Sequence, residues 1–113
     1  AFGCVVDQDF GPLVMVAPGG ILVELFDERQ VARAPFGTAK AEAMIRRLRV
    51  ARLMEGVRGE PPRDLAAAAQ ALSAFSRASA ALAVQISEME VNPVIVTATG
   101  SQAVDALIIA RKI

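Results

Sequence analysis

Histidine is absent from this chain, and cysteine occurs only once, as Cys4. Without histidine, the chain cannot itself provide the usual proton shuttle near neutral pH or carry a phosphohistidine intermediate. A single cysteine excludes a disulfide framework and a cysteine-ligated metal site within the chain. We expect Cys4 to be a small buried apolar residue rather than a nucleophile. Carboxylate, amide and basic side chains remain as candidates for chemistry.

Long apolar runs are also missing, although 54% of the residues are hydrophobic. Glu24, Asp27 and Asp105 interrupt the most apolar segments, so none reaches the ~18 residues that a membrane-spanning helix needs. The first residues lack the basic start and the apolar stretch of a signal peptide. We therefore expect a soluble, cytoplasmic protein with no membrane partner.

No charge of one sign dominates, because 12 acidic residues balance 12 basic ones. A nucleic-acid-binding surface needs an excess of positive charge, so nucleic acid is not an expected partner. The length of 113 residues allows one domain, which we expect to span residues 1–113. The chain starts abruptly on an apolar strand, and we expect it to be part of a larger protein.

Residues 1–36 have the pattern of β structure. The runs "CVV" and "LVMV" flank "DQDFGP", and "ILVELF" and "VARAPF" flank "DERQ", which predicts two successive hairpins. From Thr38 the apolar spacing becomes helical, with Thr38 as the expected N-cap. Glycines and prolines in "EGVRGEPPRD" end this helix. A second helix is expected from Asp64, and its buried face is marked by Leu65, Leu72, Phe75 and Leu82.

The tail returns to β structure, because "EVNPVIV" and "QAVDALIIA" flank "TATGS" and indicate a third hairpin. Strands and helices are therefore segregated along the chain. This order predicts an α+β fold with a largely antiparallel sheet and helices on one face.

Three polar side chains alternate in "SEMEVNPVIV", at the start of the last hairpin. In a strand, Glu88, Glu90 and Asn92 share one face. If Ala98 and Thr99 form a two-residue turn, Asn92 falls opposite Asp105 and both project to the same side. A turn of another length would shift this register.

Carboxylate and amide oxygens are the ligands that Mg²⁺ prefers, together with water and substrate phosphates. Glu90, Asn92 and Asp105 are therefore candidates for a metal site that serves phosphoryl transfer. The alternative is a solvent-facing polar stripe on a half-buried hairpin. Glu24 and Arg33 each allow two interpretations. Either the side chain faces the site, or it is a solvent-facing charge, in which case Arg33 pairs with Asp27 or Glu28.

The motifs occur in the order of a known family. "DQDFGPLVMVAPGGILVELFDERQVARAPF", "LMEGVRGEPPRD", "EMEVNPVIV" and "AVDA" resemble the C-terminal half of the ATP-grasp domain of NDP-forming acyl-CoA synthetases. This family includes ADP-forming acetyl-CoA synthetase and is related to the β subunit of succinyl-CoA synthetase. The resemblance covers nearly the whole chain. It departs from the family pattern at Ala17–Gly20, where three glycines are usual.

The resemblance implies a ligase that converts an acyl carboxylate, CoA and ATP to acyl-CoA, ADP and phosphate, with Mg²⁺ and ATP/ADP as cofactors. By motif position, Asn92 and Asp105 would bind the metal, and Glu90 would lie beside the phosphate-transfer site. Glu24 and Arg33 match the family's "VEL…D…R…P" motif, which implies a position near the nucleotide. Arg58 matches a loop with a structural or interface role.

The same resemblance implies partners that this chain does not contain: the other half of the ATP-grasp domain, and a CoA-binding domain with the relay histidine. The chain alone should then have no turnover. Two alternatives remain. One is a non-catalytic ATP-grasp remnant that acts as a binding or subunit-docking module, and the other is a carboxylate–amine ligase of the ATP-grasp group. In isolation, a truncated domain with exposed apolar strand edges is also expected to dimerise, which would say little about the native assembly.

Overall fold

The computed structural model describes residues 1–19, 28–56 and 59–112. Along these segments the strands and helices are β1 (Phe2–Asp7), β2 (Gly11–Val16), β3 (Gln30–Arg33), α2 (Thr38–Arg46), α3 (Ala51–Met54), α4 (Leu65–Leu82), β4 (Ile86–Val91), β5 (Val94–Thr97), β6 (Gly100–Ala103) and β7 (Ala106–Ala110). The predicted strand "ILVELF", which contains Glu24, and the loop residue Arg58 lie outside the described residues.

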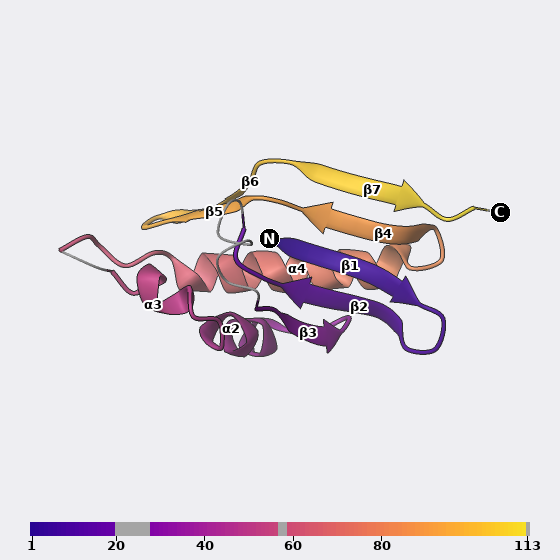
Figure 1. Cartoon of the computed structure of the whole chain (residues 1–113), viewed down its shortest axis with the longest axis horizontal. Helices are drawn as coiled ribbons and strands as arrows, with labels where there is room; N and C mark the ends of the chain where they lie inside the picture. Colours follow the sequence, from indigo (N-terminus) through magenta and orange to yellow (C-terminus); the bar gives the residue numbers. More distant parts are fainter. Residues whose placement is uncertain (20–27, 57–58, 113) are drawn as a thin grey trace.

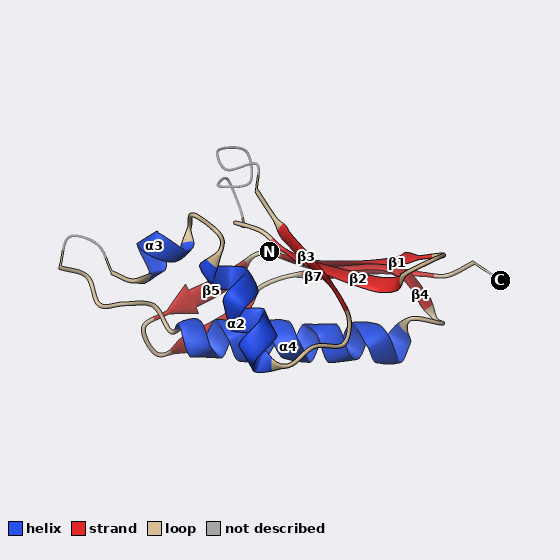
Figure 2. Cartoon of the chain, turned by 90° about the horizontal axis from the view of Figure 1, so that it is seen from below, coloured by secondary structure: helices blue, strands red, loops and turns tan. Residues whose placement is uncertain are grey.

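Five strands form the main sheet, in the order β3-β2-β1-β4-β7, and every neighbouring pair is antiparallel. β5 and β6 form a separate two-stranded sheet that continues from β4 and β7 (Figure 1). The two longer helices, α2 and α4, lie on one side of the main sheet, and the short α3 lies beyond the end of the sheet (Figure 2). The predicted α+β class, with a largely antiparallel sheet and helices on one face, is therefore confirmed.

The sheet buries alternate side chains against the helices, as the two-residue period of a strand requires. Phe2 and Cys4 of β1 and Val14 and Val16 of β2 are all buried. They pack against one face of α4, where the ring centroid of Phe75 lies 5.7 Å from that of Phe2. The opposite face of the sheet carries no described helix and stays open (Figure 2).

The β1–β2 turn is built by an aspartate and a glycine. The Asp7 carboxylate accepts hydrogen bonds from the backbone N–H groups of Asp9 (2.8 Å) and Phe10 (3.0 Å). These bonds, the one from Phe10 first, lower the pKa of Asp7. Gly11 closes the turn at φ +75°, a conformation that residues with a Cβ rarely adopt.

The two predicted helices are present as α2 and α4, with one correction to the start of α2. Gly37, rather than Thr38, is the N-cap, and no side chain caps this helix. The backbone of Gly37 is extended, whereas Thr38 is the first residue of the helix. Glycine is tolerated at the N-cap position. In α4, the Asp64 side chain caps the helix by accepting from the Ala67 N–H at 2.9 Å.

The β5–β6 sheet is tied to the start of α4. The Asp64 N–H donates to the carbonyl of Thr97 at 2.6 Å, and the Ser101 hydroxyl donates to the carbonyl of Ala67 at 3.4 Å. The hairpin turn is therefore fixed against a helix end, and this anchors the segment that follows Asn92. None of the described helices is both long and apolar enough to cross a membrane.

Candidate functional site

β4 presents its acidic residues on the open face of the sheet. Glu88 and Glu90 are exposed, whereas Ile86 and Met89 are buried against the helices. Glu90 lies between Gly3 of β1 and Leu107 of β7 in the strand register. The predicted alternation of polar and apolar side chains in this strand is confirmed.

The last hairpin has the two-residue turn on which the predicted register depended. Thr97 pairs with Gly100, which leaves Ala98 and Thr99 as the turn. The Asn92 N–H donates to the carbonyl of Asp105 at 3.1 Å, so these two residues lie opposite one another. The pairing of Asn92 with Asp105 is therefore confirmed at the level of the backbone.

Asp105 is exposed, and its Oδ1 atom accepts from the Ala106 N–H at 2.9 Å. This bond orients the carboxylate at the point where the chain enters β7. Since opposed residues of an antiparallel pair project to the same side, the Asn92 amide and the Asp105 carboxylate share the open face with Glu90.

The loop after β2 approaches this pair through a glycine. A Cβ atom built on Gly19 would lie 3.1 Å from Oδ1 of Asn92 and 3.7 Å from Cβ of Pro93. Backbone and amide therefore meet with no room for a side chain between them. In the sequence this loop differed from the family only by its departure from the usual three glycines at Ala17–Gly20, and its contact with Asn92 arises from the tertiary fold.

A cavity of about 310 Å³ is lined by Asn92 and Glu90, whereas Asp105 is not among the residues of its wall. Its wall includes the acidic Glu90, the amide of Asn92, and both Glu28 and Arg29 from the segment before β3. Carboxylate, amide and guanidinium groups thus surround a space large enough for small polar ligands.

Arg29 was not among the predicted site residues. It is exposed and lines the cavity. The carboxylate of Glu28, by contrast, accepts a hydrogen bond from the backbone N–H of Arg49 at 2.6 Å. In the sequence, "DERQ" is typical of a turn, and nothing in its spacing distinguishes Arg29 as a residue that lines a cavity. Only the placement of the segment before β3 reveals this.

Arg33 is on the open face but not beside Asn92. It lies opposite Leu13, which in turn lies opposite Val5. Its Nε donates to the carbonyl of Phe10 at 3.0 Å, at the β1–β2 turn. This turn is at the end of the sheet away from Asn92 and Asp105. Arg33 therefore does not pair with Glu28, and Glu24 lies outside the described residues.

The described segments hold no group of three or more acidic, histidine or cysteine side chains close enough to bind one metal ion. The candidate donors are therefore one amide and one carboxylate, Asn92 and Asp105. Magnesium commonly takes only one or two protein ligands and completes its shell with water and phosphate oxygens, so this pair fits Mg²⁺ bound together with a nucleotide.

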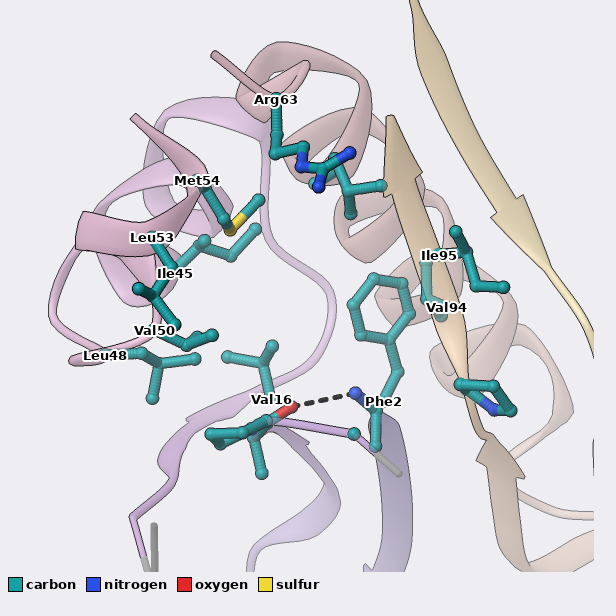
Figure 3. A pocket seen from close by; sticks show the side chains of 17 residues that line it. Phe2, Val16, Ile45, Leu48, Val50, Leu53, Met54, Arg63, Val94 and Ile95 are labelled. Carbon is teal, nitrogen blue, oxygen red and sulfur yellow. Dashed lines mark hydrogen bonds between the residues drawn. The ribbon is translucent and has the colours of Figure 1, made fainter. Parts of the chain in front are cut away.

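A second cavity, of about 430 Å³, lies between the α2–α3 segment and β5 (Figure 3). Its wall is mainly apolar, with Leu48, Leu53 and Met54 on one side and Val94 on the other; Arg63 is the charged residue in the wall. Of the predicted site residues that the structure describes, none lines it. The cavity on the open face, which Glu90 and Asn92 line, is thus the candidate site.

Residues 1–110 match the family model for the ATP-grasp domain. The chain belongs to the ATP-grasp family. Among solved structures, this ATP-grasp chain resembles a dinucleotide-forming acetyl-coenzyme A synthetase 1 from Ca. Korarchaeum cryptofilum. The TM-score is 0.87 at 39% identity, over 97% of this chain and 49% of that one. A structure of the same enzyme with coenzyme A and Mg-AMPPCP gives a TM-score of 0.84 at 38% identity, over 97% of this chain and 51% of that one.

Curated relatives give the same family. The ADP-forming acetate–CoA ligase I subunit beta of Pyrococcus furiosus is 33% identical over 107 residues, which are 95% of this chain and 46% of that protein. The ADP-forming acetate–CoA ligase I of Archaeoglobus fulgidus is 35% identical over 99 residues, 88% of this chain and 14% of that protein. The ATP-grasp chain thus spans about half or less of the length of the relatives named here.

Proposed function

We propose that this chain is the C-terminal, nucleotide- and Mg²⁺-binding part of the ATP-grasp domain of an ADP-forming acyl-CoA synthetase. The observation that carries the proposal is the backbone pairing of Asn92 with Asp105, 3.1 Å from N to O, at a point where Asn92 lines a cavity that also contains Glu90. The similar Korarchaeum enzyme was solved with Mg-AMPPCP, which supports a nucleotide and a metal as ligands of this fold.

Asn92 and Asp105 would hold the metal through their side-chain oxygens. Bound Mg²⁺ would supply positive charge that neutralises the phosphate oxygens during phosphoryl transfer. The contact between Gly19 and Asn92 keeps the amide close to the loop after β2. Arg29 adds a positive charge to the cavity wall, where it can bind a phosphate oxygen.

Glu90 would lie where the phosphoryl group is received. One structure of the Korarchaeum enzyme has a phosphohistidine segment that points towards the nucleotide-binding site. This chain has no histidine, so the corresponding imidazole would come from another part of the protein. The exposed Glu90 carboxylate can accept a hydrogen bond from an imidazole N–H and so fix which ring nitrogen faces the phosphate.

Arg33 and Glu24 have a smaller part in this proposal. Arg33 shares the open face and would contact a nucleotide only where the ligand extends towards the β1–β2 turn. Glu24 is proposed near the nucleotide from its motif position alone.

The rest of the proposed enzyme lies outside this chain. It comprises the other half of the ATP-grasp domain and a CoA-binding domain, with an acyl carboxylate, CoA and ATP as substrates. Relatives named as acetate–CoA ligases, a 4-hydroxybutyrate–CoA ligase and a trans-feruloyl-CoA synthase support a carboxylic acid as the substrate class. Because ATP and CoA are intracellular cosubstrates, we place this reaction in the cytoplasm.

The test is CoA- and carboxylate-dependent ADP release by the full-length protein, with wild type compared to Asp105→Asn. The substitution keeps the shape of the side chain and removes the charge that attracts the metal. We expect a loss of about 100-fold or more in kcat/KM, and a raised Mg²⁺ concentration at half-maximal rate. The matched control is Asp9→Asn, an exposed aspartate in the β1–β2 turn, which should change neither value.

Two outcomes would contradict the proposal. A wild-type protein that releases no ADP with a broad panel of acids would support the non-catalytic docking module instead. Equal activity of wild type and Asp105→Asn would show that the metal is bound elsewhere.

A further inference from the structure

The outer edge of the main sheet is formed by β7, an apolar strand. All five of its residues, Ala106–Ala110, are exposed. The exposed fractions are 57% for Leu107, 55% for Ile108 and 43% for Ile109. β7 pairs only with β4 among the described strands, so its second edge faces outward (Figure 1).

The hydrogen bonds to β4 show which backbone groups point outward. In an antiparallel pair, alternate residues exchange both backbone hydrogen bonds with the partner strand. The carbonyl of Asp105 accepts from Asn92, and the N–H of Arg111 donates to Gln85 at 2.9 Å. The residues that face β4 are therefore the odd-numbered ones. The N–H and C=O groups of Ala106, Ile108 and Ala110 point away from the sheet.

Natural edge strands usually carry a charge, a proline or a bulge that prevents pairing with another chain. No charged residue or proline lies between Asp105 and Arg111. The irregularity in the β4–β7 pair lies between Ile86 and Glu88 on β4, so it does not interrupt the outer edge of β7. Two opposite charges flank the uncharged strand, one at each end.

We propose that β7 pairs antiparallel with β7 of a second copy of this chain, about a two-fold axis at Ile108. In this register Ala106 lies opposite Ala110 of the copy, and Ile108 lies opposite its counterpart. All three outward-facing residues of each strand then find a backbone partner. The main sheets of the two copies become one continuous sheet with closed two-fold symmetry.

The charges select this register. With the axis at Ile108, Asp105 lies opposite Arg111 of the copy, and the pair occurs twice. A shift of two residues in one direction would place Asp105 opposite Ile109, and a shift in the other would place Arg111 opposite Leu107. Either shift also leaves one outward-facing residue of each strand without a partner. Opposed ion pairs stabilise a strand pair by several tenths of a kcal/mol, whereas these shifts forfeit them.

Pairing with Arg111 does not prevent Asp105 from binding a metal. A carboxylate has about four acceptor positions, of which the Ala106 N–H occupies one. A single strand pair buries less area than a stable interface needs, so we expect a weak, concentration-dependent dimer.

The dimer can be tested in the full-length protein by sedimentation equilibrium, with wild type compared to Ile108→Pro and Arg111→Glu. Proline removes an N–H that points outward, so it suits this edge and spares the bonds to β4. Arg111→Glu places like charges opposite one another. We expect each variant to raise the dimer dissociation constant by about tenfold or more. The double variant Asp105→Lys with Arg111→Glu restores opposite charges, and we expect it to recover most of the wild-type association.

Cross-linking gives a second, independent readout of the register. In Ile108→Cys, the two new cysteines would be ~5.5 Å apart, the Cα spacing of a hydrogen-bonded pair. In Ala106→Cys they would be ~14 Å apart, four residues along the strand. A short bismaleimide reagent should therefore cross-link Ile108→Cys and not Ala106→Cys. The buried Cys4 contributes little background.

Three results would overturn the inference. A wild-type protein that stays monomeric at high concentration would do so. Equal cross-linking of the two cysteine variants would exclude an axis at Ile108. An Ile108→Cys thiol that is protected from a small alkylating reagent in the monomer would show that another part of the same chain covers β7.

Discussion

Gly19 has a structural role that its position in the sequence does not show. A Cβ atom on this residue would come within 3.1 Å of Oδ1 of Asn92 and 3.2 Å of the backbone nitrogen of Ala1. Contacts this short force one neighbour to move, and the Asn92 side chain can move more easily than backbone. The glycine therefore acts on the proposed metal site through the position of one amide group.

We expect Gly19→Ala to raise the Mg²⁺ concentration at half-maximal ADP release by about tenfold, the typical effect of disturbing a group that orients a metal ligand. Thermal stability should change little, because the displaced amide is at the edge of the core. The control is Gly100→Ala, since nothing lies within 4 Å of a Cβ at Gly100. Equal Mg²⁺ dependence of the two variants would show that Gly19 does not position Asn92.

For individual residues, the sequence predicted a pairing that depends on local hairpin geometry. It missed the residues that reach the site through tertiary packing. The two-residue turn at Ala98 and Thr99 determines the register, and the Asn92–Asp105 pairing follows from counting. Arg29 and Gly19 reach the site through the path of other segments, which no spacing encodes. The roles of Glu90, Asn92 and Asp105 in catalysis stay predictions.

Among the elements, α4 holds the segment that precedes α2 by means of buried serines. The Ser73 hydroxyl donates to the carbonyl of Phe36 at 2.8 Å, and the Ser76 hydroxyl accepts from the Phe36 N–H at 3.1 Å. Both serines are fully buried. The backbone of Phe36 thus obtains its hydrogen bonds from a helix about 40 residues further along the chain, and these bonds fix the approach to α2.

Substitution Ser76→Ala leaves the Phe36 N–H without its hydroxyl partner in a partly buried setting. We expect a loss of ~1–3 kcal/mol in the free energy of unfolding, measured by urea denaturation. Ser79→Ala is the matched control: its hydroxyl donates at 2.8 Å to the carbonyl of Phe75 within the same helix and otherwise meets the weakly hydrogen-bonding thiol of Cys4, so the expected loss is below ~1 kcal/mol. Equal losses would mean that the link to Phe36 contributes nothing beyond burial.

The helix pattern predicted α4 from its apolar residues, and the structure buries Leu72 and Phe75 as expected. Leu65 and Leu82, at the two ends, are only partly buried. Apolar periodicity could not identify the serines, because a serine on the inner face appears polar until its partner is known. Their partner, the backbone of Phe36, is far away in sequence.

Over the whole molecule, the two faces of the main sheet differ in what they contact. The helix-covered face contains the core (Figure 2), whereas Glu90 and Asn92 line the cavity on the other face. The sequence predicted this separation of strands and helices, since each face of a strand has its own two-residue pattern. The residues within 20–27, 57–58 and 113 lie outside the described segments, and the predictions that fall on them stay open.

Because the faces are separate, stability and metal binding should respond to different substitutions. Leu72 is fully buried between α4 and the rest of the core. We expect Leu72→Ala to lower the free energy of unfolding by ~2–5 kcal/mol, through lost burial and a residual cavity. Urea denaturation would measure this, and Val84→Ala, at a residue that is 77% exposed, should change it by less than ~0.5 kcal/mol.

The folded fraction of the Leu72→Ala protein should keep the wild-type Mg²⁺ concentration at half-maximal ADP release, because Leu72 contacts the core and not the open face. Asp105→Asn should show the converse, with impaired metal dependence and a free energy of unfolding close to that of wild type, since Asp105 is exposed. If Leu72→Ala changed the metal dependence as strongly as Asp105→Asn, the two faces would be coupled through the sheet, and the open face could not be treated as an independent site.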